Sequence, residues 1–214
     1  MSEVFEKKVD EFIYNLLNFD KSIFKRKIFN PWIEFDESDI SPNAPKLRTS
    51  NLKKYLLNHK EAKYILIAES PSTGARYSGI AMTSEKVINA NNFEYDFTSI
   101  KSKSGKYVYE LTAKKVWDEI LSQKENFVMW NAFAFNFQEK SSRWFENPTE
   151  EELKQNLKIL NLFLSLYKNA KIITVGATAK NALNILGFKD FESIRHPSND
   201  FKKEFPQQFK KIIN

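Results

Sequence analysis

Residues 64–85 read YILIAESPSTGARYSGIAMTSE, an apolar run that ends in the carboxylate of Glu69 and opens into a loop rich in Pro, Gly and Ser. The run from Tyr64 to Ala68 is short and bounded by turn residues, which predicts a strand buried on both faces of a parallel sheet. Ligands of such sheets bind in the crevice beyond the carboxyl ends of the strands. Glu69 is therefore expected at the edge of a ligand site. The alternative from this stretch alone is a solvated glutamate in a polar loop.

Working outward, three further apolar runs predict strands at residues 127–133, 171–176 and 191–194. Apolar residues at helical spacing predict helices over Glu3–Asn18, Arg48–Asn58, Tyr109–Leu121, Ala177–Leu186 and Phe201–Ile213, the last with an interruption near Pro206. Capping signals predict two more: a short helix capped by Thr83 or Ser84 that runs towards Asn89, and a helix that opens at a capping box of Thr149 and Glu152. Residues 101–106 read as a basic loop, solvated or in contact with phosphate. Strands alternating with helices indicate an α/β fold with a mostly parallel sheet.

The composition of the chain narrows the classes of function that are open to it. Its 214 residues fit one domain over 1–214, with a helical part at 1–60 packed on it. A net charge of +6 suits a polyanionic partner, although a lysine-rich source proteome would also produce it. The chain has no cysteine, which excludes disulfides, thiolate zinc sites and cysteine-ligated iron–sulfur clusters. With only two histidines no histidine metal site is expected, although carboxylates can hold Mg²⁺. No signal-peptide or membrane-spanning pattern appears, so an unanchored cytoplasmic protein is expected.

Three of the predicted strands end on residues that can do chemistry: Glu69, Asn131 and His196. An acid, an amide and an imidazole in one crevice can position water, read a planar heterocycle and stabilise an anionic leaving group. A turn residue with satisfied hydrogen bonds explains Asn131 equally well. His59 closes a predicted helix, where a cation suits the negative end of the dipole, and is interpreted as structural or solvated.

The order of these motifs resembles the uracil-DNA glycosylase superfamily. The matching segments are Ala68-Glu69-Ser70-Pro71 with Tyr77-Ser78-Gly79-Ile80-Ala81-Met82, then Trp130-Asn131-Ala132-Phe133, Val175-Gly176 and His196-Pro197-Ser198. The resemblance implies a three-layer α/β/α sandwich around a four-stranded parallel sheet in the order 2-1-3-4. It also implies a base excision repair enzyme that removes uracil or a related damaged base from DNA. The branch that it looks most like has a first motif reading Gly-Glu-Ala-Pro-Gly.

The resemblance also implies roles for single residues. Glu69 would position water or support the sugar cation, Asn131 would read the Watson–Crick edge of the base, and His196 would contact its O2. The remaining implied base-binding residues are Met82, Ser70 and Tyr77, and the implied DNA-binding residues are Ser72, Arg76, Arg143, Ser198, Asn199 and Phe201.

The chain departs from the family pattern in several places. Its first motif reads Ala68-Glu69-Ser70-Pro71-Ser72, the cluster-binding cysteines of that branch are absent, and Met82 stands where the family has a stacking aromatic residue. A methionine sulfur can still lie on a ring face. Asp200 would repel a phosphate, which leaves Phe201 as the apolar wedge.

The function expected from the sequence is therefore a monomeric DNA glycosylase without cofactor or metal. It would be monofunctional, because no lysine is marked as a Schiff-base nucleophile. Two other classes stay open: a nucleic-acid or nucleotide-binding module that has lost turnover, favoured by Met82 and Asp200, and a hydrolase of free nucleosides acting through Glu69.

Overall fold

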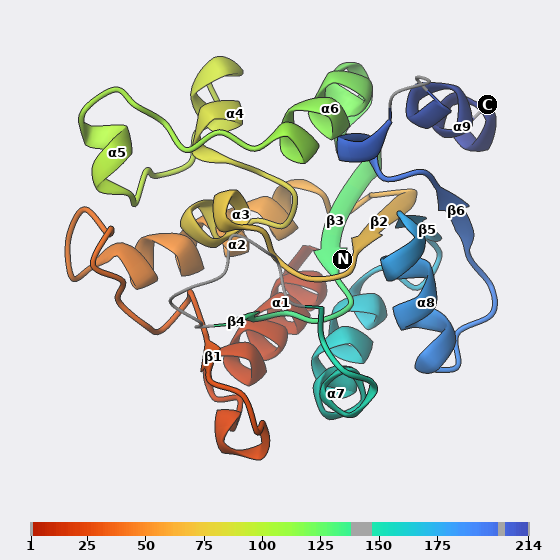
Figure 1. The fold of residues 1–214 in the computed structure, drawn as a ribbon, viewed down its shortest axis with the longest axis horizontal. Helices are drawn as coiled ribbons and strands as arrows, with labels where there is room; N and C mark the ends of the chain where they lie inside the picture. The colour runs from red at the N-terminus through yellow and green to blue at the C-terminus, as the bar shows by residue number, and fades with distance from the viewer. Residues whose placement is uncertain (1, 138–146, 201–203, 214) are drawn as a thin grey trace.

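A four-stranded parallel sheet forms the centre of the computed structural model, which describes residues 2–137, 147–200 and 204–213 (Figure 1). Its strands are β2 (Tyr64–Ala68), β3 (Phe127–Asn131), β5 (Lys171–Val175) and β6 (Glu192–Ile194), in the order β3-β2-β5-β6. This confirms the predicted order 2-1-3-4. The chain leaves β2 for β3 on one side and returns past it to β5 on the other, so a crevice opens at the carboxyl end of β2.

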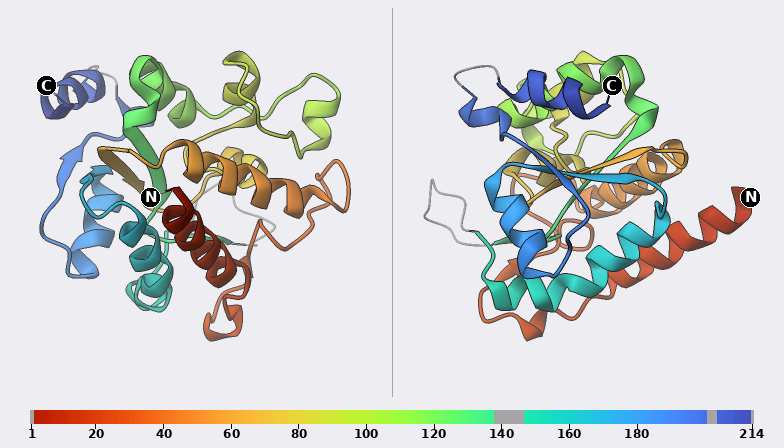
Figure 2. Two further views of the ribbon diagram at one scale, coloured as in Figure 1. Left: turned by 180° about the vertical axis from the view of Figure 1, so that it is seen from behind. Right: turned by 90° about the vertical axis from the view of Figure 1, so that its right-hand side faces the viewer.

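Helices cover both faces of the sheet, which confirms the three-layer arrangement (Figures 1 and 2). Trp130 of β3 packs on Phe12 and Phe163, from helices α1 (Ser2–Leu17) and α7 (Glu150–Leu166). Phe127 of the same strand points to the other face, because its position differs by an odd number, and packs on Phe209 of α9 (Glu204–Ile213). Helix α8 (Ala177–Ile185) contacts α7 on the first face, and α6 (Leu111–Ile120) lies with α9 on the second.

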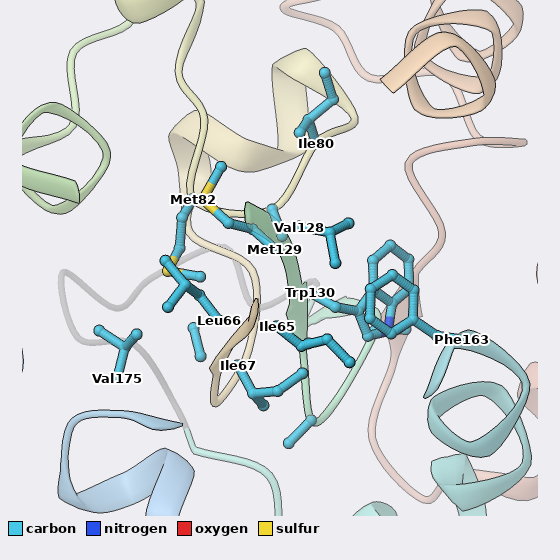
Figure 3. Packing of buried hydrophobic residues seen from close by; sticks show 14 of the residues in the cluster. Ile65, Leu66, Ile67, Ile80, Met82, Val128, Met129, Trp130, Phe163 and Val175 are labelled. Atoms are coloured by element: carbon cyan, nitrogen blue, oxygen red, sulfur yellow. The ribbon is translucent and has the colours of Figure 1, made fainter. Parts of the chain in front are cut away.

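The core is built from aromatic and branched aliphatic side chains. The rings of Trp130 and Phe163 stack with their centroids 5.0 Å apart, and Ile65, Leu66 and Ile67 of β2 are at most 1% exposed (Figure 3). β2 is therefore buried on both faces, as its continuous apolar sequence predicts.

Further elements complete the described part of the chain. They are α2 (Ala44–Asn58), α3 (Thr73–Ser78), α4 (Glu85–Ala90), α5 (Ile100–Lys103), the 3-10 turns η1 (Lys21–Ile23), η2 (Leu121–Asn126) and η3 (Pro197–Asn199), and an antiparallel pair of β1 (Ile28–Phe29) with β4 (Asn136–Phe137). None of the helices in the described ranges is long and apolar enough to cross a bilayer.

Three local predictions were wrong. Residues 73–78, expected as loop, form α3 because the Ser72 hydroxyl accepts from the Ala75 amide at 3.2 Å and Gly79 ends the helix with φ of 76°. A short helix, α5, occupies part of the predicted basic loop. Helix α9 runs through Pro206 without interruption, since this residue falls in the first turn, where amides have no helical partner.

His59 is structural, but not as a cation at a helix end. The residue is buried, its Nδ1 lies 2.6 Å from the Tyr55 carbonyl oxygen, and burial lowers the pKa of the imidazole. It is therefore neutral, and Nδ1–H donates to that carbonyl.

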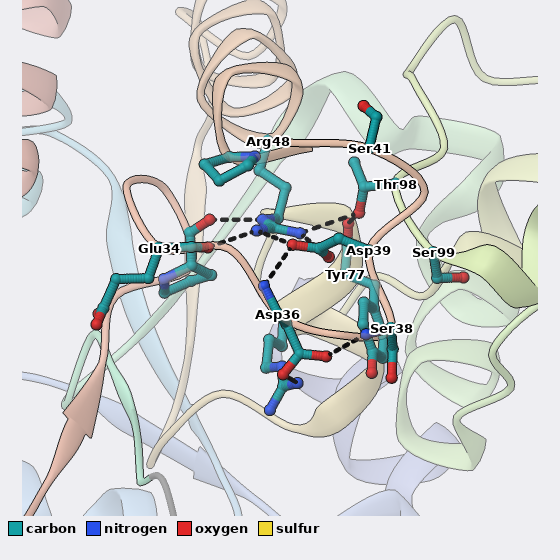
Figure 4. Close-up of polar contacts among 12 residues, drawn as sticks. Glu34, Asp36, Ser38, Asp39, Ser41, Arg48, Tyr77, Thr98 and Ser99 are labelled. Atoms are coloured by element: carbon teal, nitrogen blue, oxygen red, sulfur yellow. Dashed lines mark hydrogen bonds and ion pairs between the residues drawn. The ribbon is translucent and has the colours of Figure 1, made fainter. Parts of the chain in front are cut away.

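A fully buried ion pair joins Arg48 of α2 to Asp39 in the segment before that helix (Figure 4). The Arg48 guanidinium contacts both carboxylate oxygens of Asp39, at 2.6 and 3.0 Å, and its Nη1 lies 3.3 Å from the Thr98 hydroxyl. The same hydroxyl donates to the Tyr77 carbonyl at 2.5 Å, near the end of α3. A buried guanidinium without a partner costs much free energy, so breaking these contacts would destabilise the fold. They therefore hold the polypeptide around α3 in one arrangement.

Candidate active site

A cavity of about 430 Å³ opens at the carboxyl edge of the sheet. Seven of the residues singled out from the sequence line it, among others: Glu69, Ser70, Ser72, Met82, Asn131, His196 and Ser198. The ends of β2 and β3, the loop before α3 and the turn after β6 thus meet at one site, which suits a flipped base in size.

Glu69 is the first residue beyond β2, and the backbone holds it firmly. The amides of Ala132 and Phe133 donate to the carbonyls of Ala68 and Glu69, each at 2.8 Å, so the pairing of β2 with β3 continues past the strand ends. The half-buried side chain has a hydrogen bond with Thr178 in the first turn of α8. Burial raises the pKa of the Glu69 carboxyl from 4.5 to about 7, the range in which a carboxylate can act as a general base.

His196 lies opposite, as the residue before η3, and its ring is oriented by local hydrogen bonds. The Ser198 amide lies 3.3 Å from Nδ1 and the Ser198 hydroxyl lies 2.7 Å from the same atom. Since an amide can only donate, Nδ1 is an acceptor, and burial lowers the pKa of the imidazole. The ring is therefore neutral with its proton on Nε2, which leaves one N–H donor for a ligand.

Gly176, the residue after β5, lets the imidazole approach the sheet. Its φ is 94°, and a Cβ there would lie 2.9 Å from His196 Cβ and 3.2 Å from His196 Cδ2. Any larger residue would strain the backbone and displace the ring.

Asn131 and Met82 form another part of the lining. The Asn131 side chain is 3% exposed, and its amide has no hydrogen-bond partner among the described residues. A buried amide normally satisfies its donors and acceptors, so this one is available to a ligand. Met82 is 3% exposed and has φ of 47°, an uncommon conformation for a residue with a side chain.

The structure places two other predicted site residues outside the cavity lining. Tyr77 is buried beside the Arg48 network. Arg76 forms an ion pair with Asp36, and its guanidinium lies 4.8 Å from the centroid of the Phe29 ring. Arg143 and Phe201 lie outside the described residues, as does the side chain of Asn199.

Glu110 is a second carboxyl in the cavity, and sequence reasoning missed it. It accepts hydrogen bonds from the Ser72 hydroxyl and from the Ala75 amide, and burial raises its pKa. Gly74 makes room for it, because a Cβ there would lie 2.6 Å from Glu110 Oε2. Glu110 directly precedes α6, but glutamate is not a residue that favours the N-cap position, and its side chain makes no cap hydrogen bond. No local signal in the sequence therefore marked it.

Lys115 also went unnoticed in the sequence. Its ammonium donates to the Pro197 carbonyl at 2.7 Å and so supports the turn that carries His196. As for metals, no group of three or more His, Asp or Glu side chains in the described ranges is arranged to hold an ion.

The sheet order, the helical layers and the cavity at the carboxyl edge define an α/β protein with a uracil-DNA glycosylase-like fold. No family model matches the chain, and neither does any curated protein. Among solved structures it is similar to the crystal structure of wild-type SMUG2 from Pedobacter heparinus, with a TM-score of 0.61 and 14% sequence identity over 96% of this chain and 94% of that one. A similarity at this identity shows the fold alone.

Proposed function

We propose that the chain is a monofunctional, metal-independent DNA glycosylase that hydrolyses the N-glycosidic bond of uracil or a related damaged base. The observation that carries this proposal is the convergence of Glu69, Asn131 and His196 on one cavity. The fold similarity to SMUG2 and the order of the sequence motifs support it as analogy.

In this mechanism the base leaves before water adds. Breaking the bond between C1′ and the base nitrogen leaves positive charge on the sugar and negative charge on the base. The ionised Glu69 carboxylate stabilises the sugar cation, and water then attacks C1′ while its proton passes to that carboxylate. The Nε2–H of His196 donates to O2 of the base, and this hydrogen bond strengthens as charge develops there.

Asn131 supplies selectivity. Its carboxamide can accept from N3–H of uracil and donate to O4, whereas cytosine presents the reversed pattern of donor and acceptor. Because the amide is buried and unpartnered among the described residues, a mismatched base would leave polar groups without hydrogen bonds.

The base reaches the cavity only after it leaves the duplex stack, which costs a few kcal/mol. We propose that Met82 lies on its ring face through the thioether sulfur. Ser70, Ser72 and Ser198, which also line the cavity, remain candidates for contacts with the base and the backbone.

A binding module without turnover is the second candidate, because Met82 replaces the aromatic residue expected at the stacking position. Single-turnover excision assays on single- and double-stranded uracil DNA separate the candidates. Free deoxyuridine is the control substrate, and binding is measured on the same oligonucleotides. Release of uracil from DNA supports the glycosylase. Binding without release supports the module, and release from deoxyuridine alone supports a nucleoside hydrolase.

A further inference from the structure

Two exposed apolar side chains stand at the rim of the cavity. Tyr109 and Leu111 are 51% and 40% exposed, and both line it. In the described part of the chain, the other exposed large hydrophobic side chains lie away from this cavity: Val4, Tyr14, Ile23, Ile33, Phe35, Ile100 and Leu121. Apolar surface beside a ligand site is commonly a contact surface.

The backbone explains why these two side chains point outward. Glu110 between them is extended, with φ of −141° and ψ of 123°, so successive side chains alternate in direction. Glu110 is turned inward to the Ser72 hydroxyl and the Ala75 amide. The inward anchor fixes its neighbours on the opposite side, facing solvent.

Anchoring also makes the rim rigid. Tyr109 and Leu111 flank a residue bonded to the loop of the first motif, and Leu111 begins helix α6. A backbone segment held in this way loses little conformational freedom on binding. Lys86 is exposed, and its ammonium lies 4.9 Å from the centroid of the Tyr109 ring, which places a positive charge beside that ring.

We propose that Tyr109 and Leu111 contact the nucleobases next to the flipped nucleotide and hold the gap that it leaves. This rests on the proposed function, because it takes the cavity as the site of the flipped base. DNA is the occupant that fits: an aromatic ring stacks on any base, a leucine fills space left by an unstacked one, and the adjacent lysine suits phosphate. The pair would act on DNA binding and base extrusion, and Glu110 would act as their positioning residue.

The test measures affinity for oligonucleotides that contain a tetrahydrofuran abasic analogue, in which no bond can be cleaved. Tyr109→Ala and Leu111→Ala should each bind about 5-fold to 100-fold more weakly than wild type, the range for loss of one stacking or wedging contact. Tyr109→Phe should retain most of the affinity. The slope of log affinity against log salt should stay unchanged, because neither residue contacts a phosphate.

Tyr14→Ala and Leu121→Ala are matched controls, since these residues are 67% and 41% exposed and lie away from the cavity. Both should bind as wild type does. Tyr109→Trp gives a second readout that needs no loss of affinity: its indole fluorescence should be quenched by the abasic oligonucleotide beyond the change seen in wild type.

The outcomes separate the two proposals. Three results would each overturn the rim contact. They are alanine variants that bind like wild type, a Tyr109→Trp variant that shows no added quenching, and a wild-type protein that does not bind DNA. A different result would overturn only the proposed glycosylase function. In that case the wild-type protein binds the abasic oligonucleotide through Tyr109 and Leu111 but excises no base, and the rim contact stands.

Discussion

Replacing Glu69 by Gln should stabilise the protein at alkaline pH while abolishing the proposed reaction. The carboxyl has a pKa of about 7 in the folded protein, against its usual 4.5, because burial disfavours the ionised form. The unfolded chain therefore ionises more readily as the pH rises. The resulting penalty on folding is absent below pH 4.5, grows between about pH 4.5 and 7, and is complete above pH 7.

The size of the effect follows from the separation of the two pKa values. At about 1.4 kcal/mol for each pH unit, the penalty would reach roughly 3 kcal/mol, and solvent screening of a half-buried side chain reduces it to about 1–2 kcal/mol. For a protein of this size, that corresponds to a rise in the melting temperature of roughly 2–8 °C in the glutamine variant at pH 8. No rise is expected at pH 4.5.

Melting curves of the wild type and Glu69→Gln between pH 4.5 and 8.5 measure this difference. Glu61→Gln is the control, because Glu61 is an exposed glutamate on the approach to the same strand. In wild type, the single-turnover rate should fall about tenfold for each pH unit below pH 7, as the carboxylate is lost. Parallel stability profiles of wild type and Glu69→Gln would refute a raised pKa of the half-buried Glu69 carboxyl.

Further predictions concern the rest of the site. His196→Ala should lower the single-turnover rate about 10²–10³-fold with DNA binding nearly intact. A near wild-type rate would exclude His196 from catalysis, and a joint loss of thermal stability and DNA affinity would indicate a purely structural role. Asn131→Asp should lose about 2–4 kcal/mol of transition-state stabilisation on uracil and gain some activity on cytosine, so unchanged uracil kinetics would exclude Asn131 from the site. Gly176→Ala should displace the imidazole and lower both stability and rate, as measured by melting curves and excision. Excision should persist in excess EDTA, and its loss with rescue by one metal ion would contradict a mechanism that uses no Lewis acid.

The sheet was predictable because its signals are local. β2, β3 and β5 are five-residue runs of mostly apolar residues bounded by turns, and the capping box of Thr149 and Glu152 marks the start of α7 by itself. The placement of Glu69, Asn131 and His196 followed from one topological rule, that parallel strands end at the same edge.

The lining was harder to predict, because its other members are defined by long-range contacts. Glu110 meets Ser72 across 38 residues, and Lys115 meets Pro197 across 82. Neither residue belongs to a motif, and each reads as an ordinary charged residue beside or within an amphipathic helix. The predicted placement of Tyr77 in the base-binding set illustrates the converse: it belongs to a matching motif, yet the structure buries it elsewhere.

Helix α6 supports both sides of the cavity. Glu110, directly before it, bonds to the loop of the first motif, and Lys115 within it bonds to the turn that carries His196. In evolutionary terms, the connection from β2 to β3 is therefore under two different constraints. Neither support lies in the stretch that leads to Glu110, whereas a one-residue insertion between Glu110 and Lys115 would rotate one support by about 100° relative to the other. Such an insertion would separate the two halves of the site even though every residue of the motifs remained.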